Sequence, residues 1–439
     1  MRRERFFPEQ KVYLLDGGMG SLLQKKGLPP GKAPEYMNLY HPDKVREAHQ
    51  AYLEAGSDLI QTNTFGGNPV TLKRNGLDSL AKEVNVKAGE LAIEAVKSGG
   101  EGKATAVGSI GPTGELLYPL GDLDQDQAEA AYVEQCQALQ AAGIELVNIE
   151  TMSDLRELKA AVMAAKKCGL GVMAEVSFME SGFTLSGASP QVAAATLEGL
   201  GVLVAGINCG LGPDGIKPLL KEFAACSSLP LIVQPNAGLP RVVEGKTVYD
   251  LTARSFSDLM AGLITETGPL IAGGCCGTTP EHIKALRERL NDPDFTAPVF
   301  GEDRQPKDQG VFLAGRAKGL FWTGDWARVK TVEAQALTVE SVVAAGKSTD
   351  LFGLAQISKD TGAKLVRLNL DEWQGTPADL KTFIINAQLY IAAPFSVSGA
   401  DRELLEVFFR YYIGRPLWEN TGFLDKWDNP YIPGVVTVD

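Results

Sequence analysis

Three cysteines occur where the chain could bring their thiols together. Cys209 ends the apolar run 204–210, and Cys275 and Cys276 end the apolar run 269–277, with glycines next to both motifs. Both runs have the composition of β-strands. Thiolates are common zinc ligands, and a site with three protein ligands keeps one coordination position open, as catalytic zinc sites do. The pattern therefore predicts a zinc ion that acts on a thiol substrate.

Zinc of this kind would activate a thiol without a protein base. A free thiol has a pKa of about 8.5, and only its thiolate is the nucleophile. Zinc would displace the proton and hold the sulfur, which would lower the activation free energy by at most about 2 kcal/mol. Positioning the thiolate in line with the methyl donor must contribute more, up to ~7–11 kcal/mol. We therefore expect a zinc-bound substrate thiolate as nucleophile and no protein general base. The three histidines, His41, His49 and His282, lie in or near helical stretches.

Simpler interpretations of the cysteines remain open. Cys275 and Cys276 could form a strained vicinal disulfide, or they could be small buried residues, as free cysteines often are. A third cysteine at a matching strand end favours the metal site. The remaining cysteines lie in helical stretches and are expected in the core: Cys136, Cys168 and Cys226.

Eight strand-like apolar runs alternate with helix-length segments in the first 290 residues. The runs span residues 12–18, 58–65, 105–111, 146–151, 171–178, 204–210, 229–238 and 269–277. Several are apolar on both faces, as strands of a helix-covered parallel sheet should be. Eight such units predict an α/β fold, a (β/α)8 TIM barrel, with a doubly wound sheet as the alternative.

Polar and glycine-rich motifs end most of these runs. In a barrel the carboxyl ends of the strands meet at one mouth, where active sites form. Cys209 would follow the sixth strand and Cys275-Cys276 the eighth, only two strands apart. The three sulfurs can therefore meet.

Composition excludes several classes of protein. A net charge of −12 argues against a nucleic-acid surface, which needs clustered Lys and Arg. No apolar run approaches the length of about eighteen residues that a membrane span needs. Six cysteines in 439 residues do not make a disulfide scaffold. We expect a reduced, cytoplasmic protein.

A second module follows the predicted barrel. We assign residues 1–290 to the barrel, 291–310 to a linker rich in Pro, Asp and Gly, and 311–439 to a smaller α/β module that contains all five tryptophans. Its predicted elements are strands over 364–370, 394–397 and 415–419 and helices over 377–391 and 401–412.

Seven motifs in the first part resemble a known family. They cover residues 16–24, 61–68, 108–114, 150–154, 208–213, 234–240 and 273–283. Together and in this order they resemble the homocysteine S-methyltransferase family, with the closest likeness to the homocysteine-binding module of cobalamin-dependent methionine synthase.

The resemblance implies roles for individual residues. Cys209, Cys275 and Cys276 match the zinc ligands, and Glu150 matches the carboxylate that holds the amino group of homocysteine. Glu150 could instead be a helix-capping residue. The turn of Asp16, Gly17, Gly18 and Met19 matches a loop whose backbone N–H groups receive the substrate carboxylate, with Asp16 lining the pocket. Asn208 and Thr64 complete the predicted substrate-binding set.

The second module resembles part of the pterin-binding barrel of methionine synthase. The likeness rests on residues 365–371, 394–401 and 414–420. However, Ser398 stands where an Asp is expected, and Glu419 or Asn420 where an Asn is expected. Since half the barrel is missing, our hypothesis is that the module does not bind folate. We expect it to serve as a docking surface or to form a homo-oligomer through exposed sheet edges.

The sequence lacks a corrinoid-binding motif of the type Asp-x-His-x-x-Gly. We therefore expect a methyltransferase that moves a methyl group between a methylcorrinoid (methylcobalamin), carried by a separate protein, and a thiol, most simply homocysteine to give methionine. One alternative is a free small donor, such as S-methylmethionine or a methylated amine. Another is a non-catalytic zinc-binding subunit that scaffolds a methyltransferase complex.

Overall fold

The computed structural model describes most of the chain in two units. The described residues are 2–9, 11–99, 104–239, 241–243, 246–296, 298, 311–315, 319–322, 366–373, 375–391, 394–419 and 436–438. By internal contacts, residues 1–185, 202–221 and 229–302 form one unit, and residues 186–201, 222–228 and 303–439 form the other.

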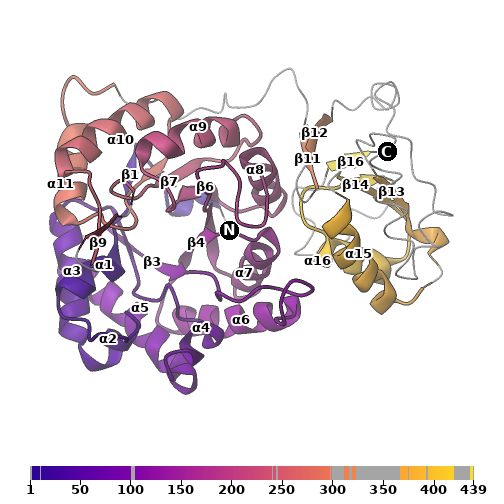
Figure 1. The fold of residues 1–439 in the computed structure, drawn as a ribbon, viewed down its shortest axis with the longest axis horizontal. Coiled ribbons are helices and arrows are strands. Elements are labelled where there is room, and N and C mark those ends of the chain that lie inside the picture. Colours follow the sequence, from indigo (N-terminus) through magenta and orange to yellow (C-terminus); the bar gives the residue numbers. More distant parts are fainter. Residues whose placement is uncertain are drawn as a thin grey trace. The chain divides into compact units, whose positions relative to one another are not determined.

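Eight parallel strands form the central sheet of the first part of the chain (Figure 1). They are β1 (Tyr13–Leu14), β2 (Leu59–Gln61), β3 (Thr105–Ile110), β4 (Leu146–Met152), β5 (Gly171–Val176), β6 (Val204–Asn208), β7 (Leu231–Gln234) and β10 (Ile271–Ala272). Neighbours follow chain order from β2 through β7 to β10 and β1. A parallel bridge between Leu15 and Leu59 then joins β1 to β2. The predicted barrel is confirmed.

Except for β4, the strands are shorter than the predicted apolar runs, mainly because their carboxyl ends leave the regular ladder. After β10 the chain still hydrogen-bonds to both neighbouring strand ends. Gly274 N–H donates to the Asp16 carbonyl at 3.0 Å, and Cys275 N–H donates to the Pro235 carbonyl at 2.9 Å. The segments that carry the polar motifs are thus fixed, although they are not strand.

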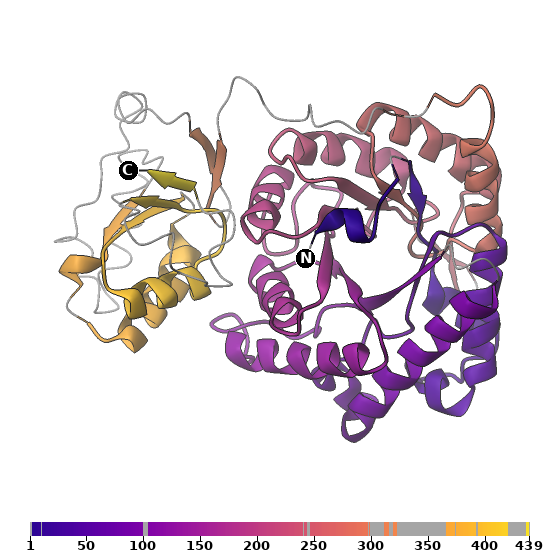
Figure 2. The same cartoon turned by 180° about the vertical axis from the view of Figure 1, so that it is seen from behind.

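Helices separate the strands and surround them (Figures 1 and 2). They are α1 (Met19–Lys25), α2 (Tyr36–Tyr40), α3 (Pro42–Glu54), α4 (Pro69–Lys73), α5 (Ala81–Ser98), α6 (Gln125–Ala141), α7 (Leu155–Lys167), α8 (Pro190–Gly199), α9 (Pro213–Ala224), α10 (Ala253–Thr267) and α11 (Pro280–Leu290). Several begin with Pro after a capping side chain, such as Asn68 before α4 and Ser189 before α8. Across the described residues, no helix has the length and apolarity needed to span a membrane.

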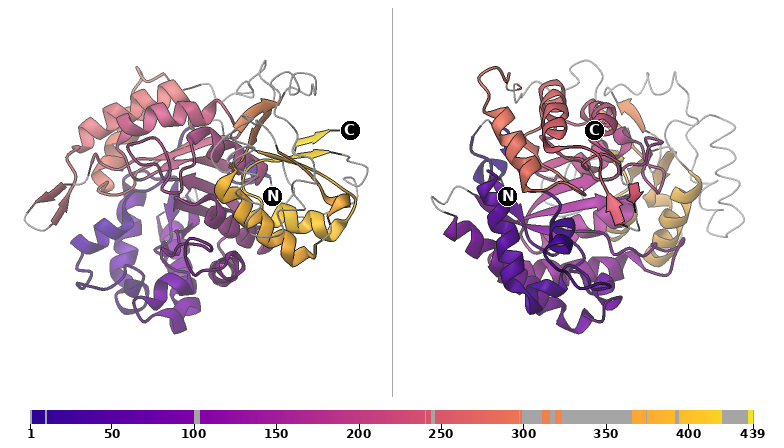
Figure 3. Two further views of the ribbon diagram at one scale, coloured as in Figure 1. Left: turned by 45° about the vertical axis from the view of Figure 1, so that its right-hand side comes forward. Right: turned by 60° about the vertical axis from the view of Figure 1, so that its left-hand side comes forward.

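A hairpin interrupts the connection between β7 and α10. Its strands, β8 (Arg241–Val243) and β9 (Lys246–Val248), are antiparallel and stand away from the barrel sheet (Figure 3). The sequence pattern did not predict this hairpin. It brings the segment after β9 to the carboxyl end of β7.

The barrel interior changes from apolar to polar along the strands. Leu15, Val107 and Met173 belong to one buried apolar cluster with residues of neighbouring strands. In a second group the Asn148 amide nitrogen lies 2.8 Å from the Gln61 amide oxygen and 2.8 Å from a Glu175 carboxylate oxygen. Layers of inward side chains are the rule in such barrels. Here the polar layer is linked to the cysteine segment, because the Gln234 side chain accepts from Asn148 Nδ2 at 3.1 Å and donates to the Gly274 carbonyl at 3.1 Å.

The second module contains a four-stranded parallel sheet. Its strands are β13 (Val366–Asn369), β14 (Phe395–Ser398), β15 (Leu417–Glu419) and β16 (Val436–Val438), with helices α15 (Pro377–Tyr390) and α16 (Arg402–Tyr411). A short 3-10 helix (Leu370–Glu372) follows β13, and the hairpin of β11 (Val311–Ala314) and β12 (Gly319–Trp322) precedes it. The three strands and two helices predicted here are confirmed.

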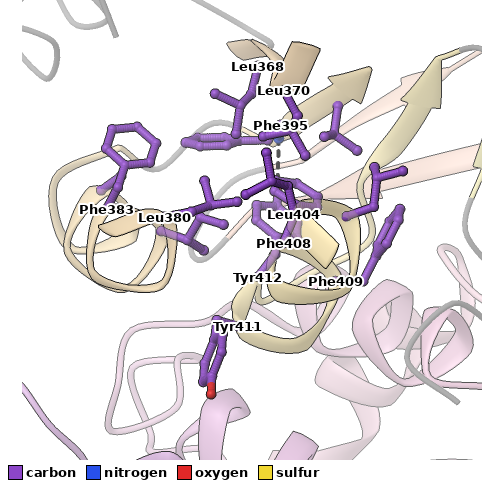
Figure 4. Close-up of a cluster of buried hydrophobic side chains, with 14 of the residues drawn as sticks. Leu368, Leu370, Leu380, Phe383, Phe395, Leu404, Phe408, Phe409, Tyr411 and Tyr412 are labelled. Atoms are coloured by element: carbon purple, nitrogen blue, oxygen red, sulfur yellow. Dashed lines mark hydrogen bonds between the residues drawn. The ribbon is translucent and has the colours of Figure 1, made fainter. Parts of the chain in front are cut away.

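Aromatic and aliphatic side chains fill the core of this module (Figure 4). Phe408 stacks on Tyr412 with ring centroids 5.0 Å apart, and Trp418 is fully buried in the same cluster. Trp373 packs against the cluster. Most of the predicted linker, together with Asn420, Trp326 and Trp427, lies outside the described residues, as do the side chains of Trp322 and Glu419.

Candidate active site

The three predicted metal ligands meet at the barrel mouth. Cys209 follows β6, and Cys275 and Cys276 follow β10. The three sulfurs lie within 4.8 Å of one another; Cys276 Sγ is 3.8 Å from Cys209 Sγ and 4.0 Å from Cys275 Sγ. Tetrahedral zinc with bonds of about 2.3 Å separates two sulfur ligands by about 3.8 Å. The sulfurs therefore fit three corners of a zinc tetrahedron.

The end of β7 holds both cysteine segments in place. Cys209 N–H donates to the Gln234 carbonyl at 3.0 Å, and Cys276 N–H donates to Asn236 Oδ1 at 3.1 Å. Cys209 adopts a left-handed conformation with φ 57°. Such a conformation costs a non-glycine residue about 1–3 kcal/mol and is typical of functional sites. The strain at Cys209 turns its thiol toward the other two.

The thiols perturb one another. Hydrogen bonding from Cys209 and then from Cys275 lowers the pKa of Cys276, while burial opposes the change. Hydrogen bonding to Cys209 raises the pKa of Cys275 well above its usual value. Three neighbouring thiols cannot all ionise without a compensating positive charge. A divalent cation would supply that charge, so the chemistry of the donors also fits zinc.

Glu150 lies near the end of β4 and is joined through Asn208 to the chain that carries Cys209. It is buried, accepts a hydrogen bond of 2.6 Å from Ser109 Oγ at Oε1, and lies 3.3 Å from Asn208 Nδ2 at Oε2. Burial raises the pKa of Glu150 to about 7. A substrate ammonium group would favour the charged carboxylate. The alternative capping role is filled by Asp154, whose side chain accepts from the Arg156 N–H at the start of α7.

Asn208 links Glu150 to a second strained residue, Thr151. Its Oδ1 accepts from the Thr151 N–H at 2.7 Å, and its Nδ2 donates to Thr151 Oγ1 at 2.8 Å. Thr151 has φ 60°, which is unusual for a β-branched residue. Asn208 thereby connects the carboxylate to the backbone that carries Cys209.

Asp16 lies at the end of β1 and is fully buried. Its Oδ2 accepts from the Gln61 N–H at 2.8 Å, whereas its Oδ1 has no hydrogen-bond partner among the described residues. Burial raises the pKa of Asp16 well above its ordinary value. An unpartnered buried oxygen of this kind can accept a hydrogen bond from a bound ligand.

Gly17 and Gly18 let the following turn press against the cysteine loop. A Cβ at Gly17 would lie 2.6 Å from Thr278 Oγ1, and one at Gly18 would lie 2.8 Å from the Cys275 carbonyl oxygen. The Gly18 N–H donates to Thr278 Oγ1 at 3.1 Å, so that one of the turn's N–H groups is occupied. Met19 begins α1. Binding of a substrate carboxylate by this turn stays a prediction.

Thr64 holds Ser109 in place near the ends of β2 and β3. It is buried, and its hydroxyl donates to the Ser109 carbonyl at 2.7 Å and lies 2.5 Å from Thr62 Oγ1. These contacts join the ends of β2 and β3 and fix Ser109, which in turn holds Glu150. A direct contact between Thr64 and substrate stays a prediction.

Four further residues lie at the site, and the sequence pattern predicted no role for any of them. Ser109, Asn236 and Thr278 lie within the motifs, but their types and spacing are equally typical of loops. Tyr249 lies outside every motif, in the segment after β9. Only the folded chain shows that these side chains contact the site.

Solved structures share the fold of the first part. The metallated and oxidized forms of the homocysteine methyltransferase MmuM from Escherichia coli each superpose with a TM-score of 0.55 and 24% identity. Each match covers 66% of this chain and 100% of that chain. Their likeness supports the barrel architecture.

Curated relatives and a family model give the assignment. Methionine synthase of Mycobacterium leprae is 33% identical over 302 residues, which cover 64% of this chain and 25% of that protein. Methionine synthase of Mycobacterium tuberculosis is 32% identical over 291 residues, covering 63% and 24%. The chain thus spans about a quarter of their length. The homocysteine S-methyltransferase model matches residues 13–290. The chain therefore belongs to the homocysteine S-methyltransferase family.

Proposed function

We propose that this protein methylates the thiol of homocysteine to give methionine, with zinc held by Cys209, Cys275 and Cys276. The methyl group would come from a methylcorrinoid carried by a separate protein. One observation carries the proposal: three sulfurs with the spacing of a zinc tetrahedron share a mouth with a buried carboxylate, Glu150.

The residues divide the work between the two ends of the substrate. Zinc on three thiolates would supply the charge that keeps a substrate thiol deprotonated near neutral pH. Glu150 would accept hydrogen bonds from the substrate ammonium group. Ser109 and Asn208 hold the Glu150 carboxylate in one orientation. Asp16 Oδ1 offers a further buried acceptor. Fixing both ends would align the substrate sulfur for transfer, where positioning can contribute about 7–11 kcal/mol.

Exposed apolar side chains support a donor that is presented by another protein. Apart from Tyr40 and Tyr390, the large apolar side chains exposed in the described part of the chain lie in the connections that follow β2, β3, β5 and β7, including the β8–β9 hairpin. They are Phe65, Leu116, Tyr118, Leu120, Met179, Phe183, Leu185, Leu239 and Val248. These loops follow the carboxyl ends of strands and therefore border the mouth. Exposed apolar surface of this kind is typical of interaction sites.

A free small donor is the second candidate, either S-methylmethionine or a methylated amine. One observation favours it: the Escherichia coli homocysteine methyltransferase is matched over 100% of its chain by 66% of this one. A barrel alone therefore suffices for a homocysteine methyltransferase, without an attached corrinoid domain.

A donor panel with defined metal content separates the two candidates. The reduced, full-length chain would be assayed for methionine with homocysteine and either methylcobalamin, S-methylmethionine or a methylated amine, with zinc measured in each preparation. We expect about one zinc per chain and turnover with methylcobalamin. Turnover with only a small donor would favour the second candidate. Full zinc occupancy without turnover on any donor would leave a scaffold role.

A further inference from the structure

A closed ring of hydrogen bonds crosses the barrel interior and joins the two parts of the site. Its members lie on or directly after five different strands, and four of them take part with buried side chains or buried carboxylates. We call this set the polar ring; it consists of Asp16, Gln61, Asn148, Gln234 and Gly274.

Every contact of the polar ring has the length of an ordinary hydrogen bond. Gln61 N–H donates to Asp16 Oδ2 at 2.8 Å. Asn148 Nδ2 donates to Gln61 Oε1 at 2.8 Å and to Gln234 Oε1 at 3.1 Å. Gln234 Nε2 donates to the Gly274 carbonyl at 3.1 Å, and Gly274 N–H donates to the Asp16 carbonyl at 3.0 Å. Each member is thus held from two sides.

The polar ring is attached to both ends of the candidate site. The Gln234 carbonyl accepts from Cys209 N–H at 3.0 Å, and the Gln234 side chain holds the carbonyl of the residue before Cys275. Asp16 carries the buried Oδ1 that has no partner among the described residues. Glu150 follows Asn148 by two residues on β4. The ring therefore connects the three thiols to the two buried carboxylates.

Barrel stability alone does not explain this ring. Branched apolar side chains usually fill the interior of such barrels, and a buried polar group is unfavourable unless its hydrogen bonds are made. The two hydrogens of the Asn148 amide are shared among three oxygens, since Glu175 Oε2 also lies 2.8 Å from Nδ2. Asn148 Oδ1 and Glu175 Oε1 have no partner among the described residues. An apolar layer would hold the strands together without these costs.

A fixed distance across the site has a chemical use. Homocysteine would bind through its sulfur and, three carbons away, through its ammonium and carboxylate groups. Both ends can bind at once only where the two parts of the site keep the matching separation. An alkyl thiol that lacks the charged groups gains nothing from that separation. A rigid connection between the two parts therefore favours an amino-acid thiol.

We propose that Asn148 and Gln234 are positioning residues, which fix the distance between the three sulfurs and the carboxylates that would hold the other end of the substrate. This distance selects an amino-acid thiol over an alkyl thiol. The inference rests on the proposed function, because it takes homocysteine as the substrate and a metal ion at the three cysteines. It deepens that function by assigning the selectivity to residues that need not contact the substrate.

Binding of two thiols to the cobalt(II)-substituted chain tests this role without a methyl donor. The chain would be titrated with homocysteine and with 1-propanethiol, which has the same three carbons without the charged groups. The sulfur-to-cobalt charge-transfer band reports coordination of each thiol. We expect Gln234→Met to lower the preference for homocysteine about tenfold, because the charged end loses the alignment of a hydrogen bond. The Kd of 1-propanethiol should not change.

A second variant and a matched control accompany Gln234→Met. Asn148→Ala breaks the polar ring at another member and should lower the same preference, so it tests the proposal even if Gln234→Met does not fold. Gln388→Met is the control in the second module. Gln388 is also a buried glutamine; its Nε2 donates to the Tyr411 carbonyl at 3.1 Å and its Oε1 accepts from Ile413 N–H at 2.6 Å. This control should leave the preference unchanged.

The ratio of the two Kd values separates positioning from general loosening. An unchanged ratio in the folded ring variants would overturn the proposal, as would an equal loss of affinity for both thiols. Wild-type turnover is measured in parallel. Preference for homocysteine without turnover on any methyl donor counts against the proposed function alone. A wild type that does not bind cobalt, or that binds both thiols equally, counts against both.

Discussion

The two sheets of this chain use the ends of their strands differently. In the barrel, Glu150 and Cys209 end strands and are turned into one pocket, where the three sulfurs lie within 4.8 Å of one another. In the second module, Asp371 follows β13 and accepts from the Ala400 N–H at 2.8 Å. Asp401 follows β14 and caps α16 by accepting from the Leu404 N–H at 3.1 Å. These two carboxylates stabilise backbone.

Closure explains the difference. The bridge between Leu15 and Leu59 completes a ring, so strand ends that are distant in sequence face one another across a single mouth. Among the described residues, the four strands β13 to β16 form an open row, so that each strand end lies beside the ends of its immediate neighbours and does not face a ring of other strand ends. A polar residue at such an end is then used as a helix cap or a loop contact. A closed barrel and an open parallel sheet can therefore differ in whether their strand ends form a binding site, although both are α/β folds.

Removal of one metal ligand should have the largest effect. We expect Cys276→Ala to lower methyl transfer by more than about 100-fold, because losing even an outer-shell partner of a metal costs 10–100-fold. Zinc content should fall in parallel, whereas unfolding of the second module should be unchanged. Cys226→Ala, at a buried cysteine away from the mouth, is the control. Full activity in Cys276→Ala would refute the metal site.

Damage to the core of the second module should leave the chemistry of the barrel intact. Phe408 is fully buried, and Phe408→Ala should lower the free energy of unfolding of the module by about 3–5 kcal/mol. Because all five tryptophans lie between residues 322 and 427, tryptophan fluorescence in urea reports on this part of the chain alone. Zinc content and homocysteine binding should not change. Loss of both would show that the module takes part in the site.

Glu150→Gln should weaken substrate binding without removing the metal. We expect KM for homocysteine to rise about 10–100-fold at unchanged zinc content, because a buried charged partner is lost. Since burial raises the pKa of Glu150 to about 7, wild-type KM should also rise as pH falls through that value and the carboxylate becomes neutral. The Gln variant should lack this component of the pH profile. Identical pH dependence in both proteins would contradict an ammonium-binding role.

Folate should have the smallest effect. Asp371 and Asp401 are engaged with backbone N–H groups, which supports our hypothesis that the second module does not bind a pterin. We expect no heat on titrating the full chain with methyltetrahydrofolate, measured by calorimetry. Quenching of tryptophan fluorescence by the same ligand provides an independent check. Saturable binding in either experiment would contradict the hypothesis.

Much of the fold could be predicted because hydrophobic periodicity is a local property. All eight barrel strands, the strands β13, β14 and β15 and the helices α15 and α16 lie within the predicted runs to within a residue. The bounds were less accurate: β10 is only Ile271–Ala272, within a predicted run of nine residues. The glycines and cysteines that end this run hydrogen-bond to the ends of neighbouring strands at the mouth and do not have strand geometry.

The sequence by itself determined the types of residue in the site and their order along the chain. It also determined the family, since three cysteines, an acidic residue and glycine turns recur at strand ends. Tertiary structure decided which of them meet. The contact of Cys276 with Asn236 joins residues 40 positions apart, and that of Gly18 with Thr278 joins residues 260 positions apart. Tyr249, which follows a hairpin without a motif, packs against Gly277. Such contacts arise from closing the barrel, which no local pattern encodes.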